Sequence, residues 1–562
     1  MKSPSLPSKR RGASISDHRR FSFSRFRNIS IEHLAILASL FFSLTANHLF
    51  FSAALSNRDW SQGSSWLFAL AMFVTITALH AAGLLLVFNR WSAKPILTVL
   101  LIATAGASFY MDKYTVFFDP DMVRNVLRTD VKEASELFSL GLAIHMLLYT
   151  VLPAIVVWWL HIQRRQSWLR AAMVRLLYLI AAIVLTAGSI FVVFQDFSSL
   201  MRNHKEVRYL ITPSNYLYSL TRVLSKDSAH ADKAIIPINT DAKLAAGWGK
   251  RDKPLLFIMV VGETTRAANW GLNGYTHQTT PELSKLDVMN FSNVTSCGTN
   301  TEVSVPCMFS PYGRHNYDQD AIQQHQSLLH ILDHVGIKTI WRDNQAGCKH
   351  VCDGLEEQRL DNSKDPELCA GDRCLDEIML KDLGAEIKKA NNGNLFIVLH
   401  QLGNHGPAYY RRYPDSLRKF TPTCDTPDLS KCTREQIVNS YDNAVLYTDY
   451  FVAKTIAFLK QQTTYDTALW YMSDHGESLG ENGIYLHGMP YSIAPKEQTH
   501  VPMVLWMSQN FTSDFGLNRD CLAKKTSDAL SQDYLFSSIL GMLQIHSRYY
   551  DPAYDLSASC RK

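Results

Sequence analysis

Five apolar segments between residues 30 and 200 predict helices that cross a membrane. They cover approximately these residues: Leu34–Leu55, Trp66–Phe88, Pro95–Met111, Leu140–His161 and Ala172–Phe194. Most reach the ~20 residues that span the hydrocarbon core of a bilayer, and the third is the shortest. Several are apolar all round, which argues against helices of a soluble core. The first is too long for a removed signal peptide and is poor in small residues that would form a cleavage site.

Basic residues between these segments predict the orientation. The N-terminal tail and the loops Arg90–Lys94 and Arg164–Arg170 are basic, and cytoplasmic loops collect Lys and Arg. The loops Ser56–Ser65 and Asp112–Ser139 then lie outside, although four basic residues weaken the bias of the second: Lys113, Arg124, Arg128 and Lys132. An odd number of spans places residue 195 onward outside the inner membrane, in the periplasm.

Beyond residue 250, short apolar runs alternate with helical patterns. The runs predict buried strands: Pro254–Val261, Lys338–Trp341, Leu395–Leu399 and Ala468–Met472. Helices are expected over Gln324–Val335 and Val438–Lys460. Strand, polar loop and helix in alternation predict an α/β domain with a largely parallel central sheet.

Chain organisation follows from these two halves. We expect a basic cytoplasmic tail at 1–30, a five-helix transmembrane domain at 31–197, an interfacial helix and linker at 198–249, and a periplasmic catalytic domain at 250–562. Ser198–Ser225 mixes aromatic and basic residues, so it suits either a helix lying on the bilayer or a plain linker helix. A net charge of +5 without a basic motif bearing interleaved aromatics makes nucleic acid an unexpected partner.

All ten cysteines lie in the second half, from Cys297 onward. An even number, mostly in close pairs, favours disulfides in an oxidising compartment and so agrees with the orientation. A structural zinc site is the alternative, but the spacings are irregular and no C-x2-C pair occurs. Sequence alone does not fix the pairing. Joining neighbours gives 297–307, 348–352, 369–374 and 424–432, and leaves Cys521 with Cys560.

Polar residues with metal-binding chemistry follow several of the predicted strands. Glu263 follows the first, His405 lies shortly after the third, and Asp474 and His475 follow the fourth, with His487 in the same loop. In an α/β sheet, ligands bind outside the carboxyl ends of the strands. Carboxylate and imidazole together suit a divalent metal such as zinc. The alternative for the Asp-His pair alone is a solvated loop.

A turn rich in hydroxyls, TSCGTNTEVSVPCMFS, starts at Thr295. If a helix begins just after Thr301, its free N–H groups and dipole favour a phosphate there. A threonine near a metal can lose its proton and act as a nucleophile. The ordinary alternative is a helix cap.

These motifs together resemble the phosphoethanolamine transferases of Gram-negative bacteria, and most of all their lipid A-modifying branch. The resemblance rests on VVGETTR, SCGTNTEVSVPCMFS, GNHGP and SDHGESLGENGIYLHG, and it covers nearly the whole chain. It implies zinc ligation by Glu263, Thr301, Asp474 and His475. One firmly bound zinc is implied, with a second as an option.

The resemblance also implies roles in the reaction. Thr301 would be the nucleophile that takes up phosphoethanolamine, and His405 and His487 would hold the transferred phosphate or a second zinc, one of them protonating the leaving group. Lys349 matches a substrate-contacting lysine. The trio Asn125, Thr129 and Glu133 matches residues proposed to bind the ethanolamine head group; its spacing puts it on one face if helical, and a plain polar face is the alternative.

A monomeric, multi-pass inner-membrane enzyme follows from the resemblance, with phosphatidylethanolamine as donor and lipid A or lipopolysaccharide as acceptor. The added amine would lower surface negative charge and weaken binding of polymyxin and other cationic peptides. Alternatives are transfer to core sugars, a related glycerol-phosphate transferase and a non-catalytic membrane sensor. A sulfatase needs C-x-P-x-R; Cys369 has Arg373 at the right distance but Gly371 in place of proline, so that activity is rejected.

Overall fold

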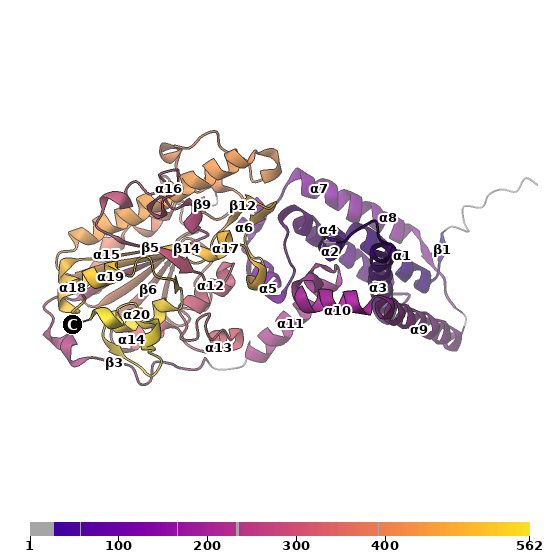
Figure 1. Ribbon diagram of the computed structural model, residues 1–562, viewed down its shortest axis with the longest axis horizontal. Helices are drawn as coiled ribbons and strands as arrows, with labels where there is room; N and C mark the ends of the chain where they lie inside the picture. Colours follow the sequence, from indigo (N-terminus) through magenta and orange to yellow (C-terminus); the bar gives the residue numbers. More distant parts are fainter. Residues whose placement is uncertain are drawn as a thin grey trace, which may run out of the picture.

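The computed structural model describes residues 27–561, except residues 57, 166, 232–234, 372 and 392. A bundle of helices formed by the first part of the chain lies beside an α/β domain formed by the second part (Figure 1). Helices α10 and α11 run between the two, and α5 and α6 of the bundle's outer loop lie at the junction (Figure 1). Most of the expected basic tail falls outside the described residues, and Asn28–Ile29 (β1) pairs with His161–Ile162 (β2).

Among the described residues, four helices are long and apolar enough to span a membrane, or five if a bent pair counts as one span. They are α3 (Gly63–Val87), α4 (Ala93–Tyr114), the run Leu140–Trp159 made of α7, a π turn and α8, and α9 (Trp168–Val192). In the most apolar window of α9 only 6% of residues are buried, so its apolar side chains face outward, as lipid contact requires.

The first predicted span is wrong as a single helix. It forms α1 (Ile31–Thr45) and α2 (His48–Leu55), which meet at 60°. Asn47 lies at the bend, where its side-chain amide donates to the carbonyls of Phe42 (2.9 Å) and Thr212 (2.7 Å). The bond to Thr212 ties the bend to a segment that follows the last apolar helix. The hydrophobic periodicity of residues 34–55 gives no sign of this long-range contact.

The outer loop between α4 and α7 carries α5 (Pro120–Arg128) and α6 (Val131–Glu136). The predicted single face for Asn125, Thr129 and Glu133 is therefore wrong. Thr129 leaves the helix with extended backbone (φ −64°, ψ 130°), and Asp130 caps α6 by accepting from the Glu133 N–H at 2.8 Å. The capping aspartate starts a second helix in a new direction.

The connector consists of α10 (Phe194–Asn203), a 3-10 turn (Lys205–Leu210) and α11 (Ser214–Ala231). One helix over Ser198–Ser225 is thus wrong, and α11 continues into the predicted linker. Thr212-Pro213 separates the last two pieces, because proline cannot donate to a preceding helical turn. An interfacial position for these helices stays a prediction.

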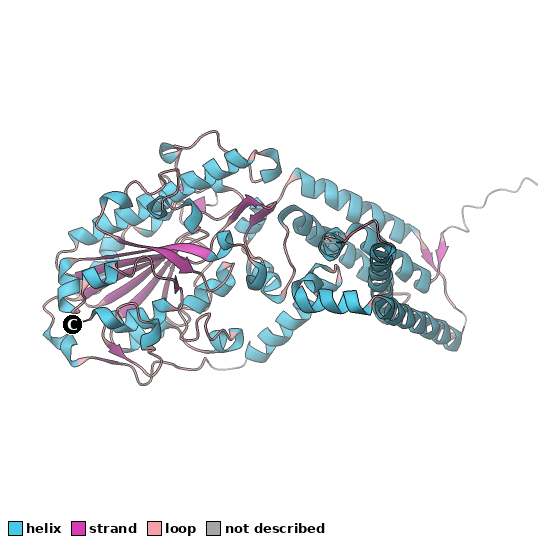
Figure 2. Ribbon diagram, in the orientation of Figure 1, coloured by secondary structure: helices cyan, strands magenta, loops and turns pink. Residues whose placement is uncertain are grey.

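The α/β domain is built on an eight-stranded sheet of order β15-β5-β14-β11-β4-β10-β6-β7 (Figure 2). The strands are β4 (Leu255–Gly262), β5 (Met289–Thr295), β6 (Lys338–Asp343), β7 (Glu356–Arg359), β10 (Leu395–His400), β11 (Asp466–Ser473), β14 (His500–Met507) and β15 (Leu530–Ser531). The four predicted strands are confirmed as the parallel neighbours β11, β4, β10 and β6. β14, which is antiparallel to both β11 and β5, was not predicted from the sequence.

Helices cover both faces of this sheet. Alternate side chains of β4 enter two cores: Phe257 packs with α12 (Thr301–Met308), α14 (Leu328–His334) and α20 (Tyr534–Met542), and Ile258 packs with α15 (Leu383–Lys389) and α16 (Arg434–Gln461). The predicted helix Val438–Lys460 is confirmed within α16. The predicted helix Gln324–Val335 is confirmed as α14, but its start is four residues too early: α13 (Gln319–Gln324) ends at Gln324, and Ser327 caps α14 with a capping box.

All ten cysteines form disulfides, and the neighbour pairing is confirmed. The bonds join 297 to 307, 348 to 352, 369 to 374, 424 to 432 and 521 to 560. Cys297–Cys307 brackets the turn before α12, and Cys348–Cys352 closes the small loop that carries Lys349.

Candidate metal and group-transfer site

Three neighbouring strands end at one edge of the sheet and bring distant residues together. In register, Gly262 of β4 pairs with Ser473 of β11, and Val261 pairs with His400 of β10. Glu263 and Asp474 are thus the first residues beyond adjacent strands, and Asp474 N–H donates to Gly262 O at 2.8 Å. The loop after β10 passes so close to Glu263 that a Cβ at Gly403 (φ +54°) would lie 2.6 Å from the Glu263 carbonyl oxygen. Only glycine fits there.

Glu263, Asp474 and His475 form a buried cluster of potential metal ligands. One ligand atom of each lies within 4.8 Å of the others. His475 Nε2 is 3.4 Å from Glu263 Oε1 and 3.3 Å from Asp474 Oδ2. The structure therefore brings together these three residues from two loops, the one after β4 and the one after β11, as the sequence indicated.

Thr301 joins the cluster from the start of α12. The helix begins at Thr301 itself, because Asn300 takes the N-cap position and its side chain accepts from Val303 N–H at 3.0 Å. Thr301 Oγ1 lies 3.1 and 3.0 Å from the two carboxylate oxygens of Glu263 and 3.4 Å from His475 Nε2. Since Asn300 does the capping, the Thr301 hydroxyl is left to face the cluster.

The chemistry of this cluster fits a zinc ion. Asp474 Oδ2 is buried and has no hydrogen-bond partner among the described residues, a costly arrangement unless a cation fills the space. Burial and the nearby Asp474 carboxylate raise the pKa of Glu263 to about 8, a strain that a bound cation relieves. His475 Nδ1 lies 2.9 Å from Gly476 O, so that nitrogen carries the proton and leaves the Nε2 lone pair toward the cluster.

His487 lies at the edge of the cluster, and Glu477 and Tyr409 fix the orientation of its imidazole. Its ring centroid is 4.5 Å from that of His475. Its Nδ1 lies 2.6 Å from Glu477 Oε2, and the other oxygen of Glu477 accepts from the Tyr409 hydroxyl at 2.6 Å. This relay fixes the imidazole and directs its Nε2 away from Glu477, as in a base held by a carboxylate.

His405 faces the outer loop of the membrane part. Its Nε2 lies 3.0 Å from Glu133 Oε1, and its ring centroid lies 5.3 Å from that of His487. Burial opposes charge on this imidazole, but the Glu133 carboxylate outweighs that effect and raises the pKa of His405. Conversely, the pKa of Glu133 is lowered to about 2: burial opposes this, and His405 provides the main stabilisation of the carboxylate.

Next to this pair, Glu136 of α6 is enclosed by three arginines of the α/β domain. Arg412 forms hydrogen bonds with both carboxylate oxygens, Arg411 lies 3.5 Å away and Arg373 lies 3.6 Å away. Arg412 Nε also donates to His405 O at 2.7 Å. The outer loop is therefore held against the site by charge.

The remaining predicted substrate residues lie around this junction. Asn125 is half-buried on α5, and its carbonyl accepts from Thr129 Oγ1 at 2.7 Å. Lys349 places its Nζ 3.9 Å from Glu302 Oε2, next to the residue that follows Thr301. Their roles toward a substrate stay predictions.

Sequence reasoning gave no role to Glu477, Tyr409, Arg412 or Glu136. Glu477 was visible as the carboxylate two residues after His475, and its pairing with His487 could have been proposed from their shared loop. Tyr409 and Arg412 lie in a segment with no recognisable motif, and Glu136 meets Arg412 across 276 positions.

An α/β domain with its polar residues at the strand ends, carried on apolar helices, defines a membrane-bound protein of the sulfatase-like class. A family model described as Sulfatase matches residues 256–545, and one described as Phosphoethanolamine transferase EptA/EptB matches residues 76–228. The chain is 37% identical over 529 residues to phosphoethanolamine transferase EptA of Escherichia coli strain K12, covering 94% of this chain and 96% of that protein.

Two further relatives agree. Phosphatidylethanolamine transferase Mcr-1 of Escherichia coli is 37% identical over 490 residues, covering 85% of this chain and 90% of that protein. The integral membrane lipooligosaccharide phosphoethanolamine transferase A (EptA) of Neisseria meningitidis superposes with a TM-score of 0.91 at 35% identity, covering 95% of this chain and all of that one. The chain belongs to the phosphoethanolamine transferase family.

Proposed function

We propose that this transferase moves phosphoethanolamine from phosphatidylethanolamine to a phosphate of lipid A, through a phospho-threonine at Thr301. The supporting observation is the position of Thr301 Oγ1, 3.0 to 3.4 Å from Glu263 and His475 in a buried cluster with an unsatisfied Asp474 oxygen. The donor and acceptor are those of the family branch that the sequence resembles, and the relatives include a Kdo(2)-lipid A phosphoethanolamine 7''-transferase of Salmonella typhimurium at 27% identity.

Zinc is the proposed metal, held by Glu263, Thr301, Asp474 and His475. When bound, it would lower the pKa of the threonine hydroxyl and offset negative charge on the phosphoryl group. Four protein ligands of N and O type match its preferences. The buried N-terminus of α12 adds a partial positive charge where the phosphoryl group arrives.

In the first half-reaction, Thr301 Oγ1 forms a bond to phosphorus and the bond from phosphorus to the diacylglycerol oxygen breaks. The hydroxyl proton leaves Thr301, and a proton is delivered to diacylglycerol as it departs. His487, held by Glu477, is the residue best placed to hold and deliver that proton. In the second half-reaction a lipid A phosphate oxygen attacks the phospho-threonine, and the threonine oxygen regains its proton.

His405 and Lys349 would act as positive groups around the phosphodiester. The pKa of His405 is raised, so the imidazole carries charge over more of the neutral range than an ordinary histidine. Both substrates are lipids, so the site must stay close to the bilayer, and the apolar helices supply that anchor. We place the protein in the inner membrane of a Gram-negative bacterium, with the α/β domain in the periplasm.

The experiment expresses the wild type and Thr301→Ala in a Gram-negative host and records mass spectra of lipid A. The wild type is expected to add one phosphoethanolamine, and Thr301→Ala is expected to add none. Equal modification by Thr301→Ala would refute the nucleophile. Modification of core sugars in place of lipid A would move the acceptor to the alternative that the sequence left open.

A further inference from the structure

A buried carboxylate follows the proposed nucleophile directly. Glu302 lies in the first turn of α12, and only 3% of its surface is exposed. Arg128, the last residue of α5, donates to Glu302 Oε1 from across the junction between the outer loop and the α/β domain. We infer that Arg128 of the outer loop neutralises the buried Glu302 carboxylate next to the nucleophile, so that an anionic phosphodiester donor can bind there. This inference rests on the proposed function of Thr301.

The contact involves three elements of the chain. Arg128 also lies 3.6 Å from Asp227 of α11, and Arg124, buried on α5, lies 3.4 Å from the same aspartate. Outer loop, connector and nucleophile helix are thereby joined through two arginines and two acids.

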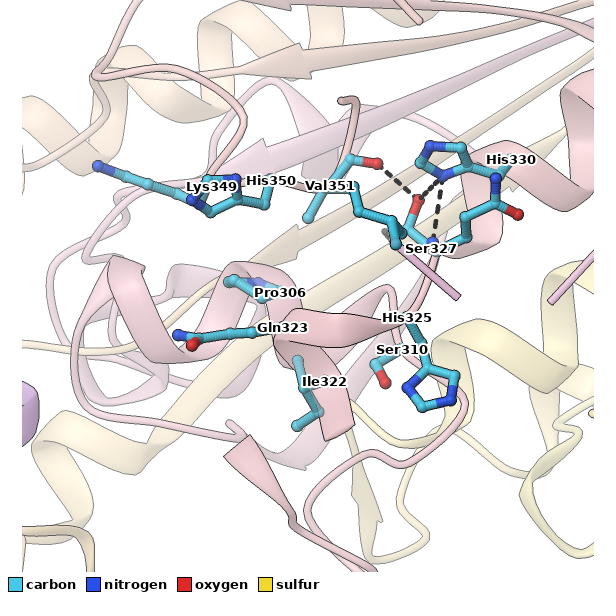
Figure 3. A pocket seen from close by; sticks show the side chains of 12 residues that line it. Pro306, Ser310, Ile322, Gln323, His325, Ser327, His330, Lys349, His350 and Val351 are labelled. Carbon is cyan, nitrogen blue, oxygen red and sulfur yellow. Dashed lines mark hydrogen bonds between the residues drawn. The ribbon is translucent and has the colours of Figure 1, made fainter. Parts of the chain in front are cut away.

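Lys349 lies nearest to the other carboxylate oxygen of Glu302, Oε2, at 3.9 Å. The disulfide-closed loop holds Lys349 and His350 at φ +50° and +71°, a conformation that non-glycine residues rarely adopt. Figure 3 shows the Lys349 side chain extending away from Ser327 and His330, which line the same cavity. That cavity has a volume of about 20 Å³, room for about one water, so it is no substrate site. The loop instead directs Lys349 toward Glu302.

The charges around Glu302 predict how the loss of Arg128 would affect binding of the donor. Arg128 and Lys349 offset the charge of Glu302, whose Oε2 has no hydrogen-bond partner among the described residues. If Arg128 is lost, a buried carboxylate remains beside the position where an anionic phosphodiester must bind, and like charges in a poorly solvated site repel. Removing the carboxylate as well should restore much of the loss. A purely structural contact would show no such recovery.

The test uses the full chain in lipid nanodiscs that contain phosphatidylethanolamine diluted in phosphatidylcholine. Release of diacylglycerol is measured against the donor fraction for the wild type, Arg128→Ala, Glu302→Gln and the double variant. We expect Arg128→Ala to raise the apparent KM for the donor about tenfold, the size expected for loss of a hydrogen bond between charged groups, with kcat changed little. The double variant should recover to within about threefold of wild type.

Two controls separate the charge effect from damage to the fold. Arg222→Ala removes an exposed arginine of α11 and should leave KM unchanged. A water-soluble nitrophenyl ester of phosphoethanolamine carries the same anionic phosphodiester, so Arg128→Ala should raise its KM as well while cleaving it at close to the wild-type kcat.

The inference is overturned if the double variant is no better than Arg128→Ala, or if Arg128→Ala lowers kcat for the soluble ester instead of raising its KM. Failure of the proposed function looks different: Thr301→Ala would still release diacylglycerol at the wild-type rate, whatever the other variants do.

Discussion

Glu136→Gln is the substitution that most directly tests how the outer loop is held on the α/β domain. Glutamine keeps the shape of the side chain and removes its charge. The wild-type carboxylate is 2% exposed and faces Arg412, Arg411 and Arg373, and the Arg412 side chain is fully buried. The substitution therefore leaves a buried guanidinium without its counter-charge.

Removing one partner of a buried ion pair costs about 3–5 kcal/mol, which corresponds to at least a hundredfold change in an equilibrium constant. We expect this cost to appear as local opening of α6. The sheet should stay folded, because the two hydrophobic cores on its faces do not include α6. Amide protection in α6 should fall about a hundredfold or more.

The pH dependence has a defined sign. Burial opposes charge on Glu136, yet Arg412 and Arg373, with His405 nearby, lower its pKa below the ordinary 4.5. A depressed pKa in the folded state means that the carboxylate stabilises docking above about pH 4.5 and loses that effect as pH falls through the folded-state value. The difference in α6 amide protection between wild type and Glu136→Gln should therefore be constant near neutral pH and become smaller in acid.

The assay is hydrogen exchange measured by mass spectrometry on the full chain in micelles, following the peptide that contains α6. Glu435→Gln, an exposed glutamate of α16, is the matched control and should leave α6 unchanged. If Glu136→Gln changes α6 protection less than about twofold, the arginine cluster does not hold the loop and the reasoning fails.

Three further outcomes are expected. Purified wild type should carry zinc by elemental analysis, and Asp474→Asn should lose at least tenfold in zinc affinity; equal zinc in both would exclude Asp474 as a ligand. Tyr409→Phe removes the hydroxyl that holds the carboxylate behind His487 and should lower kcat about tenfold at unchanged donor KM, from loss of one hydrogen bond to a charged group; a change in KM alone would argue for substrate binding instead. Replacing Cys521 and Cys560 by serine opens a loop with sequence separation 39 and should destabilise the domain by about 4 kcal/mol, read as a lower melting temperature; an unchanged Tm would refute this.

The parallel strands and the cluster of potential metal ligands could be predicted because their signals are local. Val260 and its neighbours form an uninterrupted apolar run that only a strand buried on both faces explains, and Glu263 follows it directly. The carboxyl ends of parallel strands lie at one edge of a sheet. The positions of Glu263 and Asp474 just after two such strands were therefore enough to predict that they lie close together. The antiparallel β14 carries a similar apolar run, but its direction depends on pairing with β5, which the sequence does not reveal.

The junction could not be predicted, because its contacts join residues far apart in the chain. Glu136 and Arg412 each look like ordinary surface charges in sequence, and the structure buries both. The break at Thr129 has a local cause, because Asp130 caps the next helix. The i, i+4, i+8 spacing of Asn125, Thr129 and Glu133 nevertheless suggests one continuous helix. Asn47 bends the first span through a bond to Thr212, which lies 165 positions away.

The burial of Glu136 among Arg412, Arg411 and Arg373 has a practical consequence for inhibitor discovery. A water-soluble fragment that starts at β4 would lack the outer loop, and Arg412 and Arg373 would then present bare guanidinium groups to solvent next to His405. Screening such a fragment would select anionic compounds that occupy the place of Glu136. In the intact protein these compounds would compete with a tethered carboxylate, so their potency on bacteria would fall far below their affinity for the fragment.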